Sequence, residues 1–200
     1  MAIKRDTGFK FMKLHSFAIA ALFLALAAPS AAQLVSSASN DFIDAVRKSD
    51  GGRAIELLRD KPSGLINLRG YDGDTALMIA IQRRDDEWTG FLLDKGADPD
   101  LPAKNGDTPL IAAARLGYDS AIGWLLAEGA KVDGTNRSGE TALIVAVQLR
   151  QVPVIRQLLE AGANPDKTDS AQGYSAREYA ARDPRARDIL KMITDRKPKP

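Results

Sequence analysis

The stretch GDTPLIAAARLGYDSAIGWLLAEGAKVD, residues 106–133, contains each part of a unit that recurs along this chain. Its opening motif, GDTPL, returns as GDTAL at residues 73–77 and as GETAL at residues 139–143. Its closing motif, LLAEGAKVD, returns as LLDKGADPD at residues 92–100 and as LLEAGANPD at residues 158–166. Both motifs advance by 33 residues. Two motifs in phase at one period indicate tandem repeats of a single supersecondary unit.

The residues of this unit predict a pair of helices. A threonine precedes the apolar run of the first helix, where its hydroxyl can accept an N–H group one turn further on, and Pro109 suits the first helical position. A glycine follows the second helix, where a left-handed residue would end it. Small alanines in the first helix and a Leu-Leu pair in the second predict close stacking on one continuous core. These positions are Thr75, Thr108 and Thr141; Gly96, Gly129 and Gly162; Ala80, Ala113 and Ala146; and Leu92, Leu125 and Leu158.

The pattern resembles that of ankyrin repeats, which combine a Gly-x-Thr-Pro-Leu start, an Ala-Ala pair and a Leu-Leu-x-x-Gly-Ala-Asp end. The resemblance covers residues 40–193 and implies an all-α solenoid of helix-turn-helix units with β-hairpin-like fingers. It implies about five repeats including degenerate caps, with units near 40–69, 70–102, 103–135, 136–168 and 169–193. The family usually has a histidine after Thr-Pro-Leu, which braces neighbouring loops. Here Met78, Ile111 and Ile144 take its place, and we interpret this as altered packing within the same fold.

Degenerate units flank the three clear repeats, as expected where the ends of a solenoid meet water. At the front, residues 41–48 and 53–58 align with a helix pair, and residues 65–67 are the remnant of a finger. At the back, a fourth start motif begins one residue late at Gly173, and residues 189–193 close the unit. Arg177 stands where the other units have leucine, which indicates a polar cap. We expect residues 194–200 to form a disordered tail.

The N-terminus has the pattern of an export signal. Four basic residues precede the uncharged run FAIAALFLALAA at residues 17–28, and small residues follow it. We therefore expect a signal peptide over residues 1–32, cleavage between Ala32 and Gln33, and a short linker at 33–39. The expected localisation is the periplasm, or secretion if the source has a single membrane. An uncleaved anchor is the alternative, although the apolar run is shorter than the roughly 20 residues needed to span a bilayer; Met12 is a second possible start.

Composition excludes several kinds of chemistry. The chain has 28 Lys plus Arg, 26 Asp plus Glu, one His and no Cys. Removing the leader's four bases and one acid leaves 24 basic against 25 acidic residues, so the body has no basic excess for nucleic acid or an anionic membrane. Without cysteine there is no disulfide, thiolate zinc site or cysteine nucleophile, and the lone His15 lies in the leader.

The resemblance implies a non-catalytic protein-binding module that presents finger tips and a concave face of inner helices. At the fingers, the corresponding candidate partner-binding residues are Tyr71, Asp72, Asp74, Lys104, Asn105, Asp107, Arg137, Ser138 and Glu140. On the groove side of the first helices they are Gln82, Arg83, Arg115, Leu116, Gln148 and Leu149. Leu116 and Leu149 could instead complete the packing between helices. We interpret Trp88 and Trp124, which fall on the second helices, as core residues.

These observations favour an adaptor that binds an unidentified partner protein, with no cofactor, no metal, no nucleic acid and no membrane association of the mature chain. The recurrent aspartates fit the turns in which they lie, since Asp and Asn favour turns through bonds to the backbone, and none of them requires catalysis. An inhibitor or immunity-type protein that blocks one partner is an alternative function. A membrane-tethered scaffold with an uncleaved leader is another. Capped ends predict a monomer.

Overall fold

The computed structural model describes residues 31–60 and 64–195, which form ten α-helices and two short 3-10 helices. In chain order they are α1 (Ala31–Arg47), α2 (Gly51–Asp60), η1 (Leu65–Asn67), α3 (Ala76–Gln82), α4 (Asp86–Asp94), α5 (Pro109–Leu116), α6 (Asp119–Ala127), α7 (Ala142–Gln148), α8 (Val152–Glu160), α9 (Ala176–Arg182), η2 (Pro184–Ala186) and α10 (Arg187–Thr194). Within these residues, β interactions are confined to isolated bridges such as Arg69 with Thr75 and Thr135 with Thr141. The all-helical prediction is confirmed.

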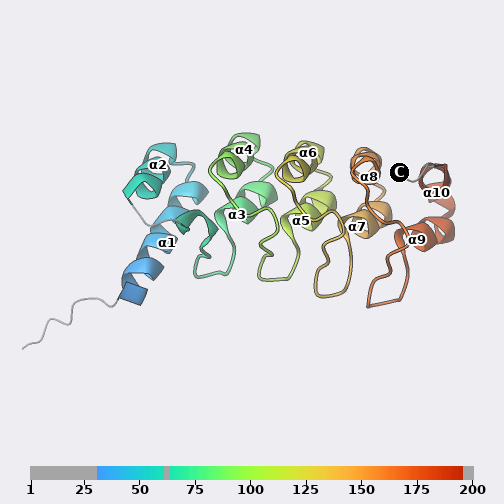
Figure 1. Ribbon diagram of the computed structural model, residues 1–200, viewed down its shortest axis with the longest axis horizontal. Coiled ribbons are helices and arrows are strands. Elements are labelled where there is room, and N and C mark those ends of the chain that lie inside the picture. Colours follow the sequence, from blue (N-terminus) through green and yellow to red (C-terminus); the bar gives the residue numbers. More distant parts are fainter. Residues whose placement is uncertain (1–30, 61–63, 196–200) are drawn as a thin grey trace, which may run out of the picture.

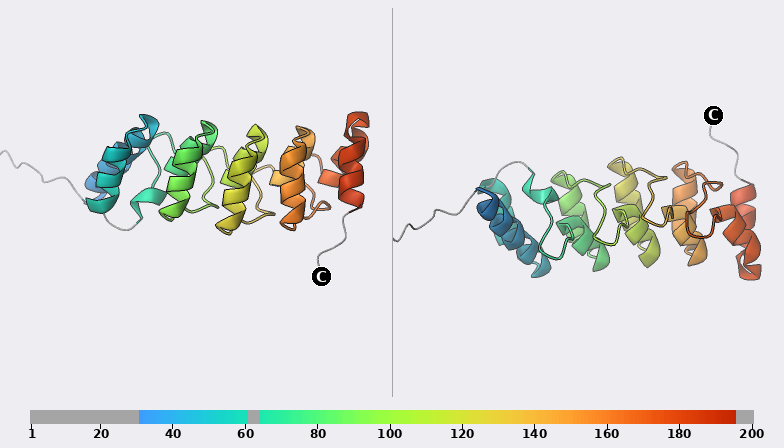
Figure 2. Two further views of the ribbon diagram at one scale, coloured as in Figure 1. Left: turned by 90° about the horizontal axis from the view of Figure 1, so that it is seen from above. Right: turned by 90° about the horizontal axis from the view of Figure 1, so that it is seen from below.

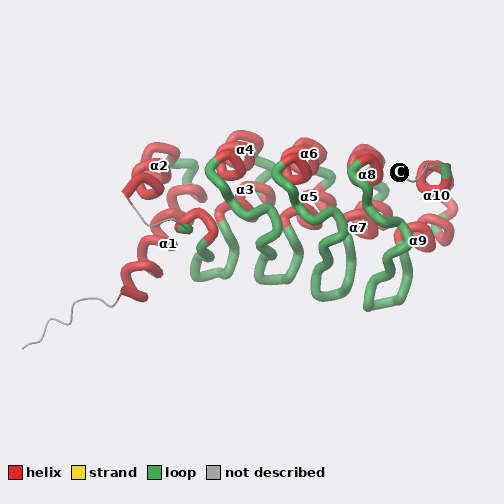
Figure 3. The backbone as a smooth tube through the Cα atoms, viewed as in Figure 1, coloured by secondary structure: helices red, strands yellow, loops and turns green. Residues whose placement is uncertain are grey.

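The helices form two rows in an elongated array. The odd-numbered helices make an inner row and the even-numbered helices an outer row, as Figure 1 and the two views of Figure 2 show. Within the inner row α3 packs on α5, α5 on α7 and α7 on α9; in the outer row α4 packs on α6 and α6 on α8. The loops that enter α3, α5, α7 and α9 project from the inner row as a third layer (Figure 3). Each repeat therefore contacts mainly its sequence neighbours, as in a solenoid.

Side-chain caps begin the first helices at the threonines that the sequence indicated. The Oγ1 atoms of Thr75, Thr108 and Thr141 each accept a hydrogen bond at 3.2 Å from the backbone N–H three residues further on. Ser175 caps α9 in the same way, and Glu178 returns a bond to the Ser175 N–H at 2.8 Å, completing a capping box. The predicted start positions are confirmed in all four units.

The core is continuous along the array and explains the missing histidines. Met78, Ile111 and Ile144 are almost completely buried among residues of the inner helices. Because an imidazole at such a position would need hydrogen-bond partners, an apolar side chain is the better fit to this environment. Trp88 is buried, as predicted, whereas Trp124 is only partly buried against the core.

The N-terminal boundary of the repeat domain differs from the prediction. Residues 33–39, expected to be a linker, belong to α1, which begins at Ala31. The reason is packing: Ala38 is buried, and the buried Ser39 donates from Oγ to the carbonyl of Arg69 at 2.7 Å. The expected cleavage point, Ala32 and Gln33, falls in the first turn of this helix, and residues 1–30 lie outside the described part of the chain.

The C-terminal boundary also shifts slightly. Thr194, expected to begin the tail, is the last residue of α10, and its hydroxyl bonds to the carbonyl of Leu190 at 2.8 Å. Asp195 is the C-cap of α10, and residues 196–200 of the expected tail lie outside the described residues. Among residues 31–60 and 64–195, no helix combines the length and the apolar character needed to cross a membrane.

Candidate partner-binding surface

Four loops, here called the fingers, make up the third layer: residues 68–74, 101–107, 134–140 and 167–174. In the first three, one N–H closes the base by donating across the finger: Gly70 to Asp74, Ala103 to Asp107, and Asn136 to Glu140, at 2.8–3.1 Å. A glycine with positive φ then turns the chain, at φ 89° for Gly73 and 95° for Gly106. These bonds close the first three fingers in the same way.

Neighbouring fingers hold one another in place. A side chain at Gly73 would meet the methylene groups of Lys104, and one at Gly106 would overlap Cγ of Arg137. The alkyl stem of each cation therefore lies against the glycine of the preceding finger. At the next step Ser170 takes this position beside Gly139, and its N–H donates to the Ser138 carbonyl at 2.8 Å. The fingers form a packed row rather than separate loops.

The first finger is held against α1. The Tyr71 N–H donates to Oδ1 of Asn40 at 3.0 Å, and Nη1 of Arg47 lies 3.3 Å from the Tyr71 hydroxyl. The same guanidinium pairs with the Asp72 carboxylate and lies 5.6 Å from the centre of the Tyr71 ring. Even so, Tyr71 is 73% exposed. An aromatic ring is thus presented to solvent on an anchored finger, although its partners Asn40 and Arg47 were not among the candidates.

Asp107 is a bracing residue rather than an exposed contact. Only 8% of its side chain is exposed, and its carboxylate accepts bonds from Arg115 at 3.2 and 3.3 Å. It also accepts from Nδ2 of Asn136 in the next finger at 2.8 Å. That amide in turn donates to Glu140 at 2.8 Å, and Arg115 lies 3.6 Å from the same carboxylate. Stacking of the repeats therefore encloses Asp107, so this candidate contact offers little surface to a partner.

Arg83 is likewise occupied inside the array. Its guanidinium donates to the carbonyls of Val46 and Arg47 at 3.1 and 3.0 Å and to the hydroxyl of Ser49 at 2.9 Å. These groups end α1, where helix carbonyls lack partners within the helix and cations are favoured. Arg83 therefore joins the first repeat to the second, and fewer of its donors face solvent than the sequence suggested.

The other candidates on the inner helices divide into two kinds. Gln82 and Gln148 are exposed at the last turns of α3 and α7, and Gln82 bonds to Asp74 at 3.4 Å. Leu116 is partly buried against the core, as the packing alternative held. Leu149 is 46% exposed. It is therefore the apolar candidate most available on this side of the array.

The fourth finger is organised by Asp169, which the candidate set did not include. Its Oδ1 accepts from the N–H groups of Ala171, Gln172 and Gly173 at 2.7–3.0 Å, and its Oδ2 accepts from the Tyr179 hydroxyl at 2.6 Å. Burial opposes ionisation of this carboxyl, but the bonds from Tyr179 and the three N–H groups outweigh it and hold its pKa below the ordinary value. Burial and the bond to Asp169 raise the pKa of Tyr179 to about 12. The sequence contained one signal for Asp169: it lies 33 residues, one repeat period, after Asn136.

Polar side chains also join the loops that follow successive second helices. The N–H of Asp98 donates to Asn67, that of Lys131 to Asp100, and that of Asn164 to Asp133, all at 2.8–2.9 Å. Each bond spans 31 residues. These carboxylates and amides brace neighbouring loops in a chain that has no histidine in its repeats.

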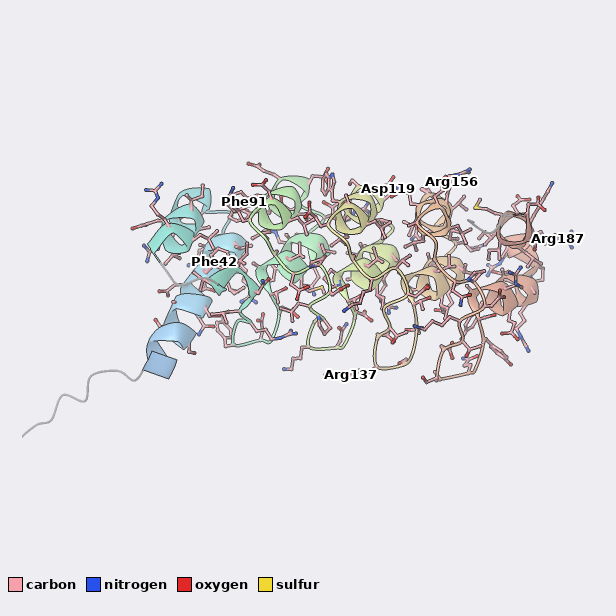
Figure 4. The ribbon with its side chains drawn as sticks, viewed as in Figure 1. Phe42, Phe91, Asp119, Arg137, Arg156 and Arg187 are labelled. Carbon is pink, nitrogen blue, oxygen red and sulfur yellow. The ribbon has the colours of Figure 1, made fainter. Side chains whose placement is uncertain are left out.

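The candidate residues therefore line one side of the array but do not form one uninterrupted patch. All except Asp107 are at least partly exposed: Tyr71, Asp72, Asp74, Gln82, Arg83, Lys104, Asn105, Arg115, Leu116, Arg137, Ser138, Glu140, Gln148 and Leu149. Figure 4 labels Arg137 on a finger, beyond the inner row of helices. In residues 31–60 and 64–195, no three His, Asp or Glu side chains converge as a metal site.

Stacked helix pairs with projecting fingers define a helical-repeat protein of the solenoid class. The model of ankyrin repeats in three copies matches the chain over residues 42–136 and again over 89–169, so the chain belongs to the ankyrin repeat family. No curated protein gives a significant match. Ankyrin repeats are a non-enzymatic interaction module and generally mediate protein–protein interaction.

Proposed function

We propose that this chain is an exported adaptor that binds a partner protein through its fingers and the exposed ends of its inner helices. The observation that carries the proposal is the exposure of Tyr71 and Leu149 on a braced scaffold. Tyrosine is enriched among residues that dominate binding energy, and a rigid scaffold loses little conformational entropy on binding.

A crosslinking experiment can test this proposal by comparing positions on opposite sides of the array. A photoreactive residue replaces Tyr71 or Leu149 on the binding side, and a control replaces the exposed Lys191 of α10. We expect one recurrent adduct from both Tyr71 and Leu149 and none from Lys191. The yield of the adduct at either position should fall when the other position carries alanine. Equal labelling from Lys191, or no recurrent adduct from the binding side, would count against the proposal.

Export is the second part of the proposal. It is supported by the basic stretch, the apolar run at residues 17–28 and the small residues before Gln33. We infer a bacterial source, a signal peptide over residues 1–32 and a periplasmic mature chain that is a monomer. Cell fractionation with N-terminal sequencing tests this: a soluble periplasmic form beginning at Gln33 is expected. A form that stays with the membrane and retains residues 1–32 would support the tethered alternative instead.

A further inference from the structure

A cleft of about 730 Å³ runs along the first three fingers. Four cations line it, Arg69, Lys104, Lys131 and Arg137, against the single carboxylate of Asp100. This concentration of positive charge is local, because the body of the chain is almost balanced in charge. A cleft lined by one sign of charge favours a ligand of the opposite sign.

Two of these cations, Lys104 and Arg137, have no partner of their own among the described residues, whereas the other two do. Lys131 lies 3.3 Å from the Asp100 carboxylate, and Nη1 of Arg69 donates to the Gly73 carbonyl at 2.7 Å. In the part of the chain that the structure describes, no carboxylate lies within 4 Å of the charged groups of Lys104 and Arg137. Arg115, by contrast, is paired with the Asp107 carboxylate, and Arg177 of α9 with that of Asp166. The cleft therefore holds positive charge that the protein itself does not neutralise.

The two free cations are also held in place. Their alkyl stems lie against Gly73 and Gly106, and both residues are nevertheless exposed to solvent. Long basic side chains normally lose considerable rotamer freedom when they bind, and packing of the stem reduces that loss. Lys104 and Arg137 are thus prepared to pair with an anion.

The arrangement of the charges points to an extended ligand. The cations come from successive fingers, and Pro102 and Ala103 provide uncharged lining between them. Packed helices lie about 8–10 Å apart. An extended chain advances about 3.3 Å per residue, so acidic residues three positions apart would match successive repeats.

We propose that the finger cleft binds an extended acidic segment of the partner protein, with carboxylates at every third position pairing with Arg69, Lys104 and Arg137. The inference rests on the proposed protein-binding function and names the chemistry of the partner. A nucleic acid is disfavoured because its phosphates require a wider basic surface than this near-neutral body offers.

The test measures binding of labelled peptides to the full chain by fluorescence anisotropy at low salt. The probe has the sequence Glu-Ser-Ala-Glu-Ser-Ala-Glu; its controls replace Glu by Gln, or place the three Glu residues side by side. A single-stranded thymidine oligonucleotide tests for a general polyanion site. We expect the spaced peptide to bind more tightly than all three controls, and its affinity to fall as salt rises.

Matched double variants locate the site. Lys104→Gln with Arg137→Gln removes two charges from the cleft, whereas Arg187→Gln with Lys191→Gln removes two exposed charges from α10. We expect the cleft variant to weaken peptide binding at least about tenfold and the α10 variant less than about twofold. Circular dichroism melting checks that both variants remain folded.

Three results would overturn the inference: no binding of the spaced peptide, equal losses in both double variants, or tighter binding of the oligonucleotide. Crosslinking at Tyr71 and Leu149 separates this failure from failure of the proposed function. If those positions still capture a recurrent partner while the peptide does not bind, the partner uses the fingers without an acidic segment. If crosslinking also fails, the proposed function fails with it.

Discussion

Asp107 concentrates several bonds on one enclosed carboxylate. Arg115 reaches it from the same repeat, and Asn136 reaches it from the next finger. Because the side chain is 8% exposed, loss of the carboxylate would leave these donors in a partly dehydrated site. A residue selected by sequence as a partner contact thus has a structural role.

We expect Asp107→Ala to lower the free energy of unfolding by about 1–3 kcal/mol, the range for enclosed hydrogen bonds to a charged group. Urea denaturation followed by circular dichroism measures the change. Glu160→Ala, at an exposed position near the end of α8, is the control and should change stability by less than about 0.5 kcal/mol. Similar losses in both variants would contradict the bracing role.

Asp169 predicts a dependence of stability on pH. Its pKa is lower in the folded chain than the ordinary value of 3.8, so its ionised form stabilises the fold. That contribution is complete above the pKa of the unfolded state and is lost as the pH falls through the lower folded pKa. Denaturation curves between about pH 6 and pH 3 should show a smaller decline for Asp169→Asn than for the wild type. Parallel pH profiles would argue against this assignment.

At the scale of single elements, α1 differs most from its sequence pattern. The degenerate repeat predicted a helix from Asp41, yet the helix begins ten residues earlier. Ser39 explains part of the extension because its hydroxyl reaches the Arg69 carbonyl at the base of the first finger. The helix thereby supports the finger that presents Tyr71.

Ser39→Ala should therefore destabilise the chain by about 1 kcal/mol, whereas Ser37→Ala on the exposed side of α1 should be neutral or slightly stabilising. Thermal melting of the two variants measures the difference. Hydrogen exchange should also increase in the first finger of Ser39→Ala alone. Equal effects of the two variants would indicate that residues 33–39 form a linker rather than a packed part of α1.

The helix caps are a second property of the elements. Thr141 is completely buried and caps α7 through Ile144. We expect Thr141→Ala to cost about 1 kcal/mol, within the usual range for an N-cap, and Thr141→Ser to recover most of that loss. Urea denaturation measures both variants, and an equally unstable serine variant would show that the methyl group, not the hydroxyl, matters.

Across the whole molecule, stability depends on how many neighbours each repeat contacts. α5 and α7 pack on inner helices at both sides, whereas α1 and α9 end the row. In the outer row, a hollow of about 370 Å³ lined by Ile55, Trp88 and Phe91 separates α2 from α4. The free energy of local opening is lowest where few apolar contacts are lost.

Native-state hydrogen exchange should therefore be slowest in α5 and α7 and faster in α2 and α10. Exchange followed by mass spectrometry measures this gradient. Filling the hollow by Ser49→Leu is not a suitable test, since Ser49 has positive φ and accepts a bond from Arg83. Ile55→Ala is suitable: it should speed exchange in α2 without changing α7. Uniform protection along the array would contradict a solenoid with independent ends.

The sequence alone determined the repeat period, the starts of α3, α5, α7 and α9, and the continuous apolar core. These features depend on local physics, because caps and helical spacing involve residues within a turn or two of one another. Only the tertiary structure showed the extension of α1, the enclosure of Asp107, the helix-ending role of Arg83 and the grouping of Arg69, Lys104, Lys131 and Arg137. Each of these involves at least one pair of residues about 30 or more positions apart, so stacking of the repeats decides which side chains meet and which keep facing solvent.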